Sequence, residues 1–63
     1  MDPRYTIQIQ YEEGGEFIPH NNIDSLNDLL WLLFTHFDNP DFYSLRVIDH
    51  QKHRQVLVDP SYF

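Results

Sequence analysis

The chain contains no cysteine, which excludes disulfide staples and thiolate metal ligands. Cations are also scarce, because four Lys and Arg residues stand against ten Asp and Glu residues and the formal net charge is −6. This balance disfavours binding to a nucleic-acid backbone or to an anionic membrane surface. No apolar run approaches the roughly 20 residues of a membrane-spanning helix, and the N-terminus lacks the order of a signal peptide. We therefore expect a cytoplasmic protein that binds neither nucleic acid nor membranes directly.

Aromatic residues are abundant, with five Phe, four Tyr and one Trp among 63 residues. A chain of this length predicts a single domain over residues 1–63 with one small core. Such a chain buries only about 60% of its unfolded surface, so its stability is marginal. Large rings that bury about 150–250 Å² each compensate for the small size. The domain folds alone or gains stability from a partner or a second copy.

Four strands are predicted. Alternation of apolar and polar residues is strict over residues 4–12, where Tyr5, Ile7 and Ile9 alternate with Thr6 and Gln8. A short return strand is expected over residues 16–20 after a turn at the two glycines, and further strands are predicted over residues 42–49 and 54–58. One apolar and one polar face are typical of an antiparallel sheet that is covered on one side only.

A helix is predicted over residues 25–37. Ser25 and Asp28 have the spacing of a capping box, and the residue before Pro40 is disfavoured in the helical region. Apolar residues repeat at helical spacing and are expected to face the sheet. They are Leu26, Leu29, Leu30, Leu33, Phe34 and Phe37. The predicted fold class is α+β, a single ββαββ domain with one helix packed on a four-stranded antiparallel sheet.

Two turns carry specific expectations. Gly14 and Gly15 supply positive φ and predict a tight first hairpin. Residues 49–53 predict a type I turn closed by a bulge residue at positive φ. His53 then takes a position where glycine is usual, which histidine tolerates.

Trp31 and Leu32 remain once the expected core stripe of the helix is satisfied. One interpretation is a partner-binding surface with Trp31 as its anchor. In the other, a curled sheet or the C-terminal tail covers both residues. The tail contains Tyr62, a further candidate for partner binding, because two terminal aromatic residues suggest that it docks on something.

Glu12, Glu13 and Glu16 cluster at the first hairpin. They are candidates for steering the protein to a basic surface of a partner. The alternative is that these carboxylates only keep the protein soluble, just as the aspartates near the helix ends only cap the helix.

The sequence argues against an enzyme and against a cofactor. It contains no catalytic triad pattern, phosphate-binding loop or zinc-protease motif. His50 and His53 share one turn with Asp49, and a metal- or nucleotide-binding regulator built on them is a distant third hypothesis. An exposed turn explains the same residues.

The segment from Ile23 to Val58 resembles small acidic accessory proteins of phages and other mobile elements. In that pattern a leucine-rich helix is followed by a strand that ends in R-V-x-D, as at residues 46–49, then a tight turn and a valine-rich strand. His53 departs from the pattern, which usually has glycine there. The resemblance implies proteins that bind and inhibit host machinery, such as anti-CRISPR and other anti-defence proteins. It implies no particular functional residue.

The first functional hypothesis is therefore a small acidic inhibitor or modulator that occludes a basic surface of a larger host protein. The alternative is a structural or assembly protein that acts as a homodimer or as a small subunit of a complex.

Overall fold

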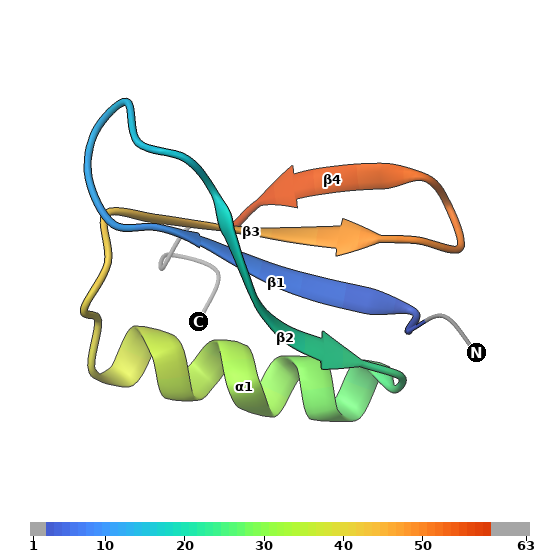
Figure 1. Ribbon diagram of the computed structural model, residues 1–63. Coiled ribbons are helices and arrows are strands. Elements are labelled where there is room, and N and C mark those ends of the chain that lie inside the picture. The colour runs from blue at the N-terminus through green and yellow to red at the C-terminus, as the bar shows by residue number, and fades with distance from the viewer. Residues whose placement is uncertain (1–2, 59–63) are drawn as a thin grey trace.

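The computed structural model describes residues 3–58 and has the element order β1 (Tyr5–Gln10), β2 (Ile18–Ile23), α1 (Leu26–Asp38), β3 (Ser44–Asp49) and β4 (Arg54–Leu57). The strands form one antiparallel sheet in the order β2-β1-β3-β4, so β2 and β4 are its edges. The helix runs along one side of the sheet (Figure 1). The predicted ββαββ domain of class α+β is confirmed.

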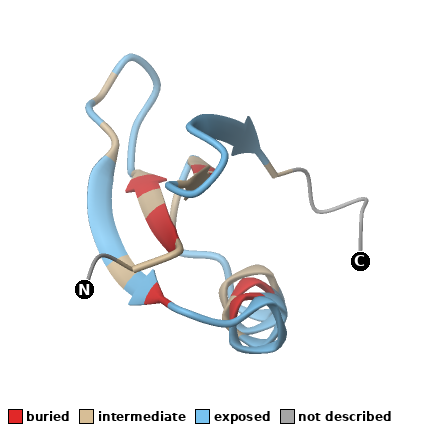
Figure 2. Cartoon of the chain, turned by 90° about the vertical axis from the view of Figure 1, so that its right-hand side faces the viewer, coloured by how far each residue is buried: buried red, intermediate tan, exposed pale blue. Residues whose placement is uncertain are grey.

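The core lies between α1 and the inner face of β1 and β3. Ile7 is fully buried in the middle of the central strand and pairs in register with Val47 of β3. Period-2 alternation thus places the predicted apolar face of residues 5–9 against the helix, as expected. Buried positions concentrate on these strands and on one side of α1 (Figure 2). The core residues are Tyr5, Ile7, Ile9, Ile23, Leu29, Leu33, Leu45 and Val47.

Strand β2 begins and ends later in the chain than predicted. Residues 21–23, which lie between the predicted strand and the predicted helix, continue the strand, and Ile23 is buried opposite Tyr5. A β-bulge makes this possible, because the register shifts between Ile7 and Gln8 and leaves His20 without a partner in β1. Pro19 is tolerated because β2 is an edge strand.

The helix begins and ends within one residue of the prediction. Ser25 is its N-cap, with an extended backbone and a side-chain oxygen that accepts from the Asp28 amide at 3.1 Å. Asn39, the residue before Pro40, leaves the helical region with φ −137° and ψ 72°. The local sequence signals were therefore sufficient to predict both ends of the helix.

The rotation of the helix differs from the expectation. Leu29 and Leu33 are buried, whereas Leu26, Leu30 and Phe34, which were expected in the core, are exposed. The helix is turned so that its Leu32 and His36 side lies next to the sheet, where His36 Nε2 is 3.2 Å from Asn21 Oδ1 of β2. The predicted core stripe is therefore right for Leu29, Leu33 and Phe37, of which the last packs against the core, and wrong for Leu26, Leu30 and Phe34.

The first hairpin is not tight, in contrast to the prediction. Residues 11–17 connect β1 to β2, and a turn is closed where the Gly15 amide donates to the Glu12 carbonyl at 3.0 Å. Only Gly14 of the two glycines has a positive φ, at 78°. The turn between β3 and β4 agrees with its prediction, because His53 has φ 54° and Asp49 Oδ1 accepts from the amides of Gln51 and Lys52.

We expect His53→Gly to stabilise the protein by about 0.5–1 kcal/mol. Glycine adopts the left-handed backbone conformation without strain, but it also raises the entropy of the unfolded chain, which offsets part of the stabilisation. Urea denaturation would measure the change. Gln51→Gly is the control, since Gln51 lies in the same turn without a positive φ. It should destabilise, and equal effects of the two substitutions would contradict the strain at residue 53.

Candidate partner-binding surface

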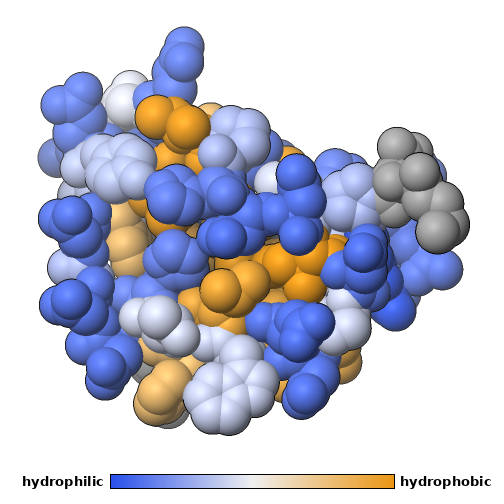
Figure 3. Space-filling view, turned by 60° about the horizontal axis from the view of Figure 1, so that its bottom comes forward, coloured by the Kyte–Doolittle hydropathy of each residue, from blue (hydrophilic) through white to orange (hydrophobic). Residues whose placement is uncertain are grey.

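The outer side of α1 exposes four large apolar residues. Their exposed fractions lie between 48% and 66%, and Trp31 is the most exposed. The Trp31 and Phe34 rings are in edge-to-face contact, with centroids 6.4 Å apart and planes at 82°. Apolar side chains gather near this side of the molecule, and hydrophilic ones surround them (Figure 3). We call Leu26, Leu30, Trp31 and Phe34 the helix face.

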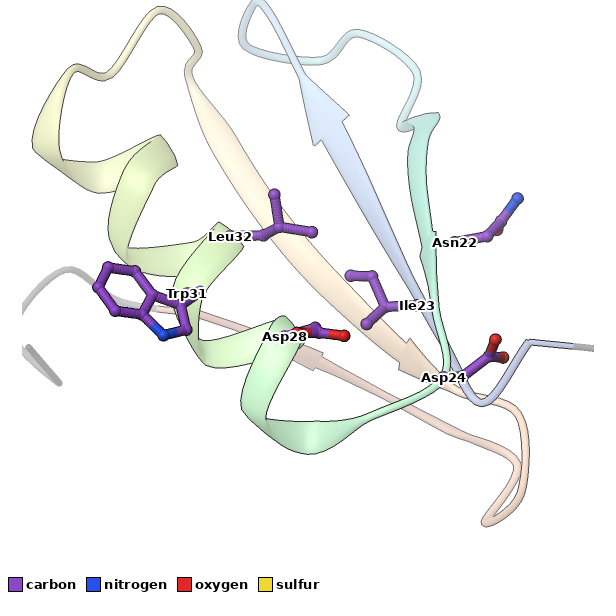
Figure 4. Close-up of a pocket in the computed structure, with 6 residues that line it drawn as sticks. All are labelled: Asn22, Ile23, Asp24, Asp28, Trp31 and Leu32. Atoms are coloured by element: carbon purple, nitrogen blue, oxygen red, sulfur yellow. The ribbon is translucent and has the colours of Figure 1, made fainter.

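A pocket of about 440 Å³ adjoins the helix face at its Trp31 side. Ile23 from the end of β2 and Leu32 from α1 lie on facing sides of it (Figure 4). Asp24 and Asp28 contribute carboxylates, one from the loop before the helix and one from its first turn. The pocket therefore combines apolar walls, two acidic groups and the indole of Trp31. Asn22 completes its lining.

This combination suits the side chain of a lysine or arginine from another molecule. The aliphatic stem of such a side chain packs on apolar walls while its charged head remains near water. The carboxylates of Asp24 and Asp28 offer charge-assisted hydrogen bonds to the head, and the Trp31 indole is the best aromatic partner for a cation. The lining of the pocket is thus chemically suited to a cationic side chain.

The residues predicted for partner binding do not form one surface. Trp31 is exposed, whereas Leu32 is half-buried and packs against the core, although it also lines the pocket. The three hairpin glutamates are exposed, but they lie in the connection from β1 to β2, across the sheet from the helix (Figure 1). They are Glu12, Glu13 and Glu16. Tyr62 lies outside the described residues.

Sequence reasoning missed most of the helix face and the pocket. The 13 residues of α1 include eight apolar ones, more than one buried side can hold. That excess signals an exposed apolar face, but it does not say which residues form it. The pocket was not predicted because no local pattern shows that Asn22, Ile23 and Asp24, which follow the predicted strand, pack beside the helix.

Two histidines lie together on the β2 side of the helix. The His20 and His36 rings are 5.8 Å apart and nearly perpendicular, and the Tyr11 hydroxyl is 2.8 Å from His20 Nε2. Burial lowers the pKa of His36 below its ordinary value of 6.5, and repulsion from His20 lowers it further.

The turn histidines do not gather a metal-ligand set. His50 Nε2 lies 2.7 Å from the Thr6 hydroxyl, which donates to Asn22 Oδ1 at 2.9 Å. Over residues 3–58 there is no group of three or more His, Cys, Asp and Glu side chains that could hold a metal ion. The metal hypothesis for His50 and His53 therefore finds no geometric support in this part of the chain.

The His36 environment predicts a pH dependence of stability. The pKa of His36 in the folded state lies below 6.5. At pH values between that pKa and 6.5, the unfolded chain therefore binds more protons than the folded protein. The free energy of unfolding should therefore fall as the pH drops from 6.5 through the folded-state pKa, and His36→Gln should lose less stability over that window. Denaturant titrations at several pH values would measure this. His53→Asn, at an exposed turn position, should keep the wild-type slope, and an unchanged slope in His36→Gln would refute the assignment.

No known protein family matches the chain, and neither a characterised protein nor a solved structure matches it. The geometry above is therefore the basis for a functional assignment. In the part of the chain that the structure describes, no helix has both the length and the apolar character needed to cross a membrane.

Proposed function

We propose that this protein is a small protein-binding domain that occludes a basic surface of a larger protein. The observation that supports the proposal best is the helix face beside the acidic pocket. Four large apolar residues of one helix are exposed, and exposed apolar patches of this kind mark interaction sites. Trp31 lies at the junction of the two features and is the expected anchor.

Charge supports a basic partner over a second copy of the chain. Each chain carries a net charge of −6, so two copies repel one another at long range, whereas a basic surface is attracted. The pocket carboxylates, Asp24 and Asp28, would meet the cationic side chains directly. A homodimer or an assembly role remains the alternative, because the same helix face would also suit a second copy.

Inhibition is the expected consequence of such binding. A domain of this size that covers a basic site would compete with the anionic ligand or nucleic acid that the site normally holds. The resemblance to phage accessory and anti-defence proteins stays a prediction about where such a partner would be found. Binding itself, rather than catalysis, is the activity we assign.

Site-specific photo-cross-linking tests the location of the surface. A photoreactive phenylalanine analogue in place of Phe34 should cross-link the partner, because Phe34 is exposed within the helix face. The same analogue at Gln51, an exposed position in the β3–β4 turn, is the matched control. The cross-link should weaken at high salt, since the carboxylates contribute to association.

Three results would contradict the proposal. Equal cross-linking from both positions would mean that the helix face is not the interface. A product of twice the chain mass would indicate the homodimer. Cross-linking that is insensitive to salt would contradict a basic partner surface.

A further inference from the structure

The outer face of the sheet, opposite α1, carries a second set of side chains. Arg46 of β3 lies in register between Gln8 of β1 and Leu57 of β4. Because side chains alternate along a strand, all three point away from the helix. Phe17, from the connection before β2, covers part of this face.

Two contacts fix the Arg46 guanidinium. Its Nε donates to Gln8 Oε1 at 2.7 Å, and its central carbon lies 4.1 Å from the centroid of the Phe17 ring. These contacts occupy the Nε edge and one face of the guanidinium. They do not involve its two terminal nitrogens, the Nη atoms. Across residues 3–58 no hydrogen bond or ion pair engages these Nη atoms. They form the planar fork that binds carboxylates in a bidentate manner.

A pocket of about 520 Å³ lies beside this guanidinium. The aromatic rings of Phe17 and Tyr43 and the side chain of Leu57 supply apolar walls. Gln10, Ser44 and Gln55 supply neutral polar groups. Among residues 3–58, Arg46 is the only charged residue of the lining, and no carboxylate from this range lines the pocket.

We propose that this pocket binds a small monocarboxylate with an apolar body. The carboxylate would take the free fork of Arg46, and the apolar body would lie against Tyr43 and Leu57. The volume falls within the range of about 300–1,000 Å³ that small-molecule sites occupy. A single charge is favoured over a phosphate dianion, because one guanidinium must act against a chain of net charge −6.

The site is independent of the proposed partner surface. The helix face and its acidic pocket lie on the inner side of the sheet, whereas Arg46 lies on the outer side. Within residues 3–58 the two pockets share no lining residue, and the charged groups are aspartates in one and Arg46 in the other. Failure of either proposal therefore leaves the other standing.

Nuclear magnetic resonance titration of the full-length protein tests the site with two matched probes. 3-Phenylpropionate carries the carboxylate, and 3-phenylpropionamide is its neutral isostere. The acid should shift the Arg46 Nε–H and the side-chain amides of Gln10 and Gln55, and should bind at least about tenfold more tightly than the amide. Equal binding of the two probes would overturn the proposal.

Variants separate the pocket from general charge effects. Arg46→Gln should remove the preference for the acid, whereas Arg54→Gln removes the same charge from the adjacent strand outside the lining and should keep affinity within about twofold. Arg46→Lys keeps the charge without the fork and should lose most of the preference. Equal losses in both glutamine variants would overturn the proposal, and so would tighter binding of inorganic phosphate than of the acid. If Arg46→Gln fails to fold, the affinities of the acid and the amide for the wild type and for Arg46→Lys test the proposal instead.

Discussion

Replacing Ile7 by alanine is expected to destabilise the protein by about 2–5 kcal/mol. Ile7 is fully buried, and it lies in the middle of β1, which pairs with β2 and β3 on its two sides. Truncation removes apolar contact and leaves a cavity that a sheet with two neighbouring strands cannot easily close. A chain of 63 residues has a total stability of about 3–9 kcal/mol at typical values per residue, so the variant should be close to its unfolding midpoint.

Urea denaturation followed by circular dichroism would measure this loss. Ile18→Ala is the matched control, because Ile18 faces the same side of the sheet on the edge strand β2 and is about half exposed. It should cost less than about 1 kcal/mol. Comparable losses at the two positions would mean that the core is not centred on β1.

The strands and the ends of the helix could be predicted because each rests on a local signal. The alternation over residues 5–9 identifies β1 without tertiary information. Ser25 and Pro40 delimit α1 through hydrogen bonding and sterics of the chain itself. Likewise, His53 could be placed at positive φ because the turn length requires such a residue.

The rotation of α1 and the end of β2 could not be predicted, because each depends on a contact between distant residues. Eight apolar residues in α1 are compatible with more than one buried side, and the side that holds Leu29 and Leu33 is the one that packs on the sheet. The end of β2 depends on the bulge that carries the strand past His20, and the same strand brings Asn21 next to His36 of the helix.

The candidate surface follows the same division. The sequence identified Trp31 as surplus to the core, and its exposure agrees with that interpretation. It did not identify the acidic pocket, since Asp24 and Asp28 meet Ile23 and Leu32 only after β2 and α1 have packed. The Arg46 pocket is even harder to predict from the sequence, because Phe17 belongs to a connection whose path no local pattern specifies.

The double substitution Trp31→Ala with Phe34→Ala is expected to lower affinity for the partner captured by cross-linking by about 2–4 kcal/mol, or roughly 30- to 1,000-fold. The two rings contact each other at the centre of the helix face and are more than half exposed. Truncation removes the anchor and one wall of the acidic pocket together. Because neither ring belongs to the core, the free energy of unfolding should change by less than about 1 kcal/mol.

Tyr43→Ala with Leu57→Ala is the matched control, because it removes one aromatic and one large aliphatic side chain of similar exposure from the opposite face of the sheet. Calorimetric titration with the partner should give wild-type affinity for this control. Leu33→Ala supplies the contrast in stability, since Leu33 adjoins Phe34 in the chain but is buried, and its loss should cost about 2–5 kcal/mol. If the Trp31 and Phe34 variant unfolded as readily as Leu33→Ala, the rotation of α1 would be wrong. If it stayed folded and bound as tightly as the wild type, the helix face would not be the binding surface.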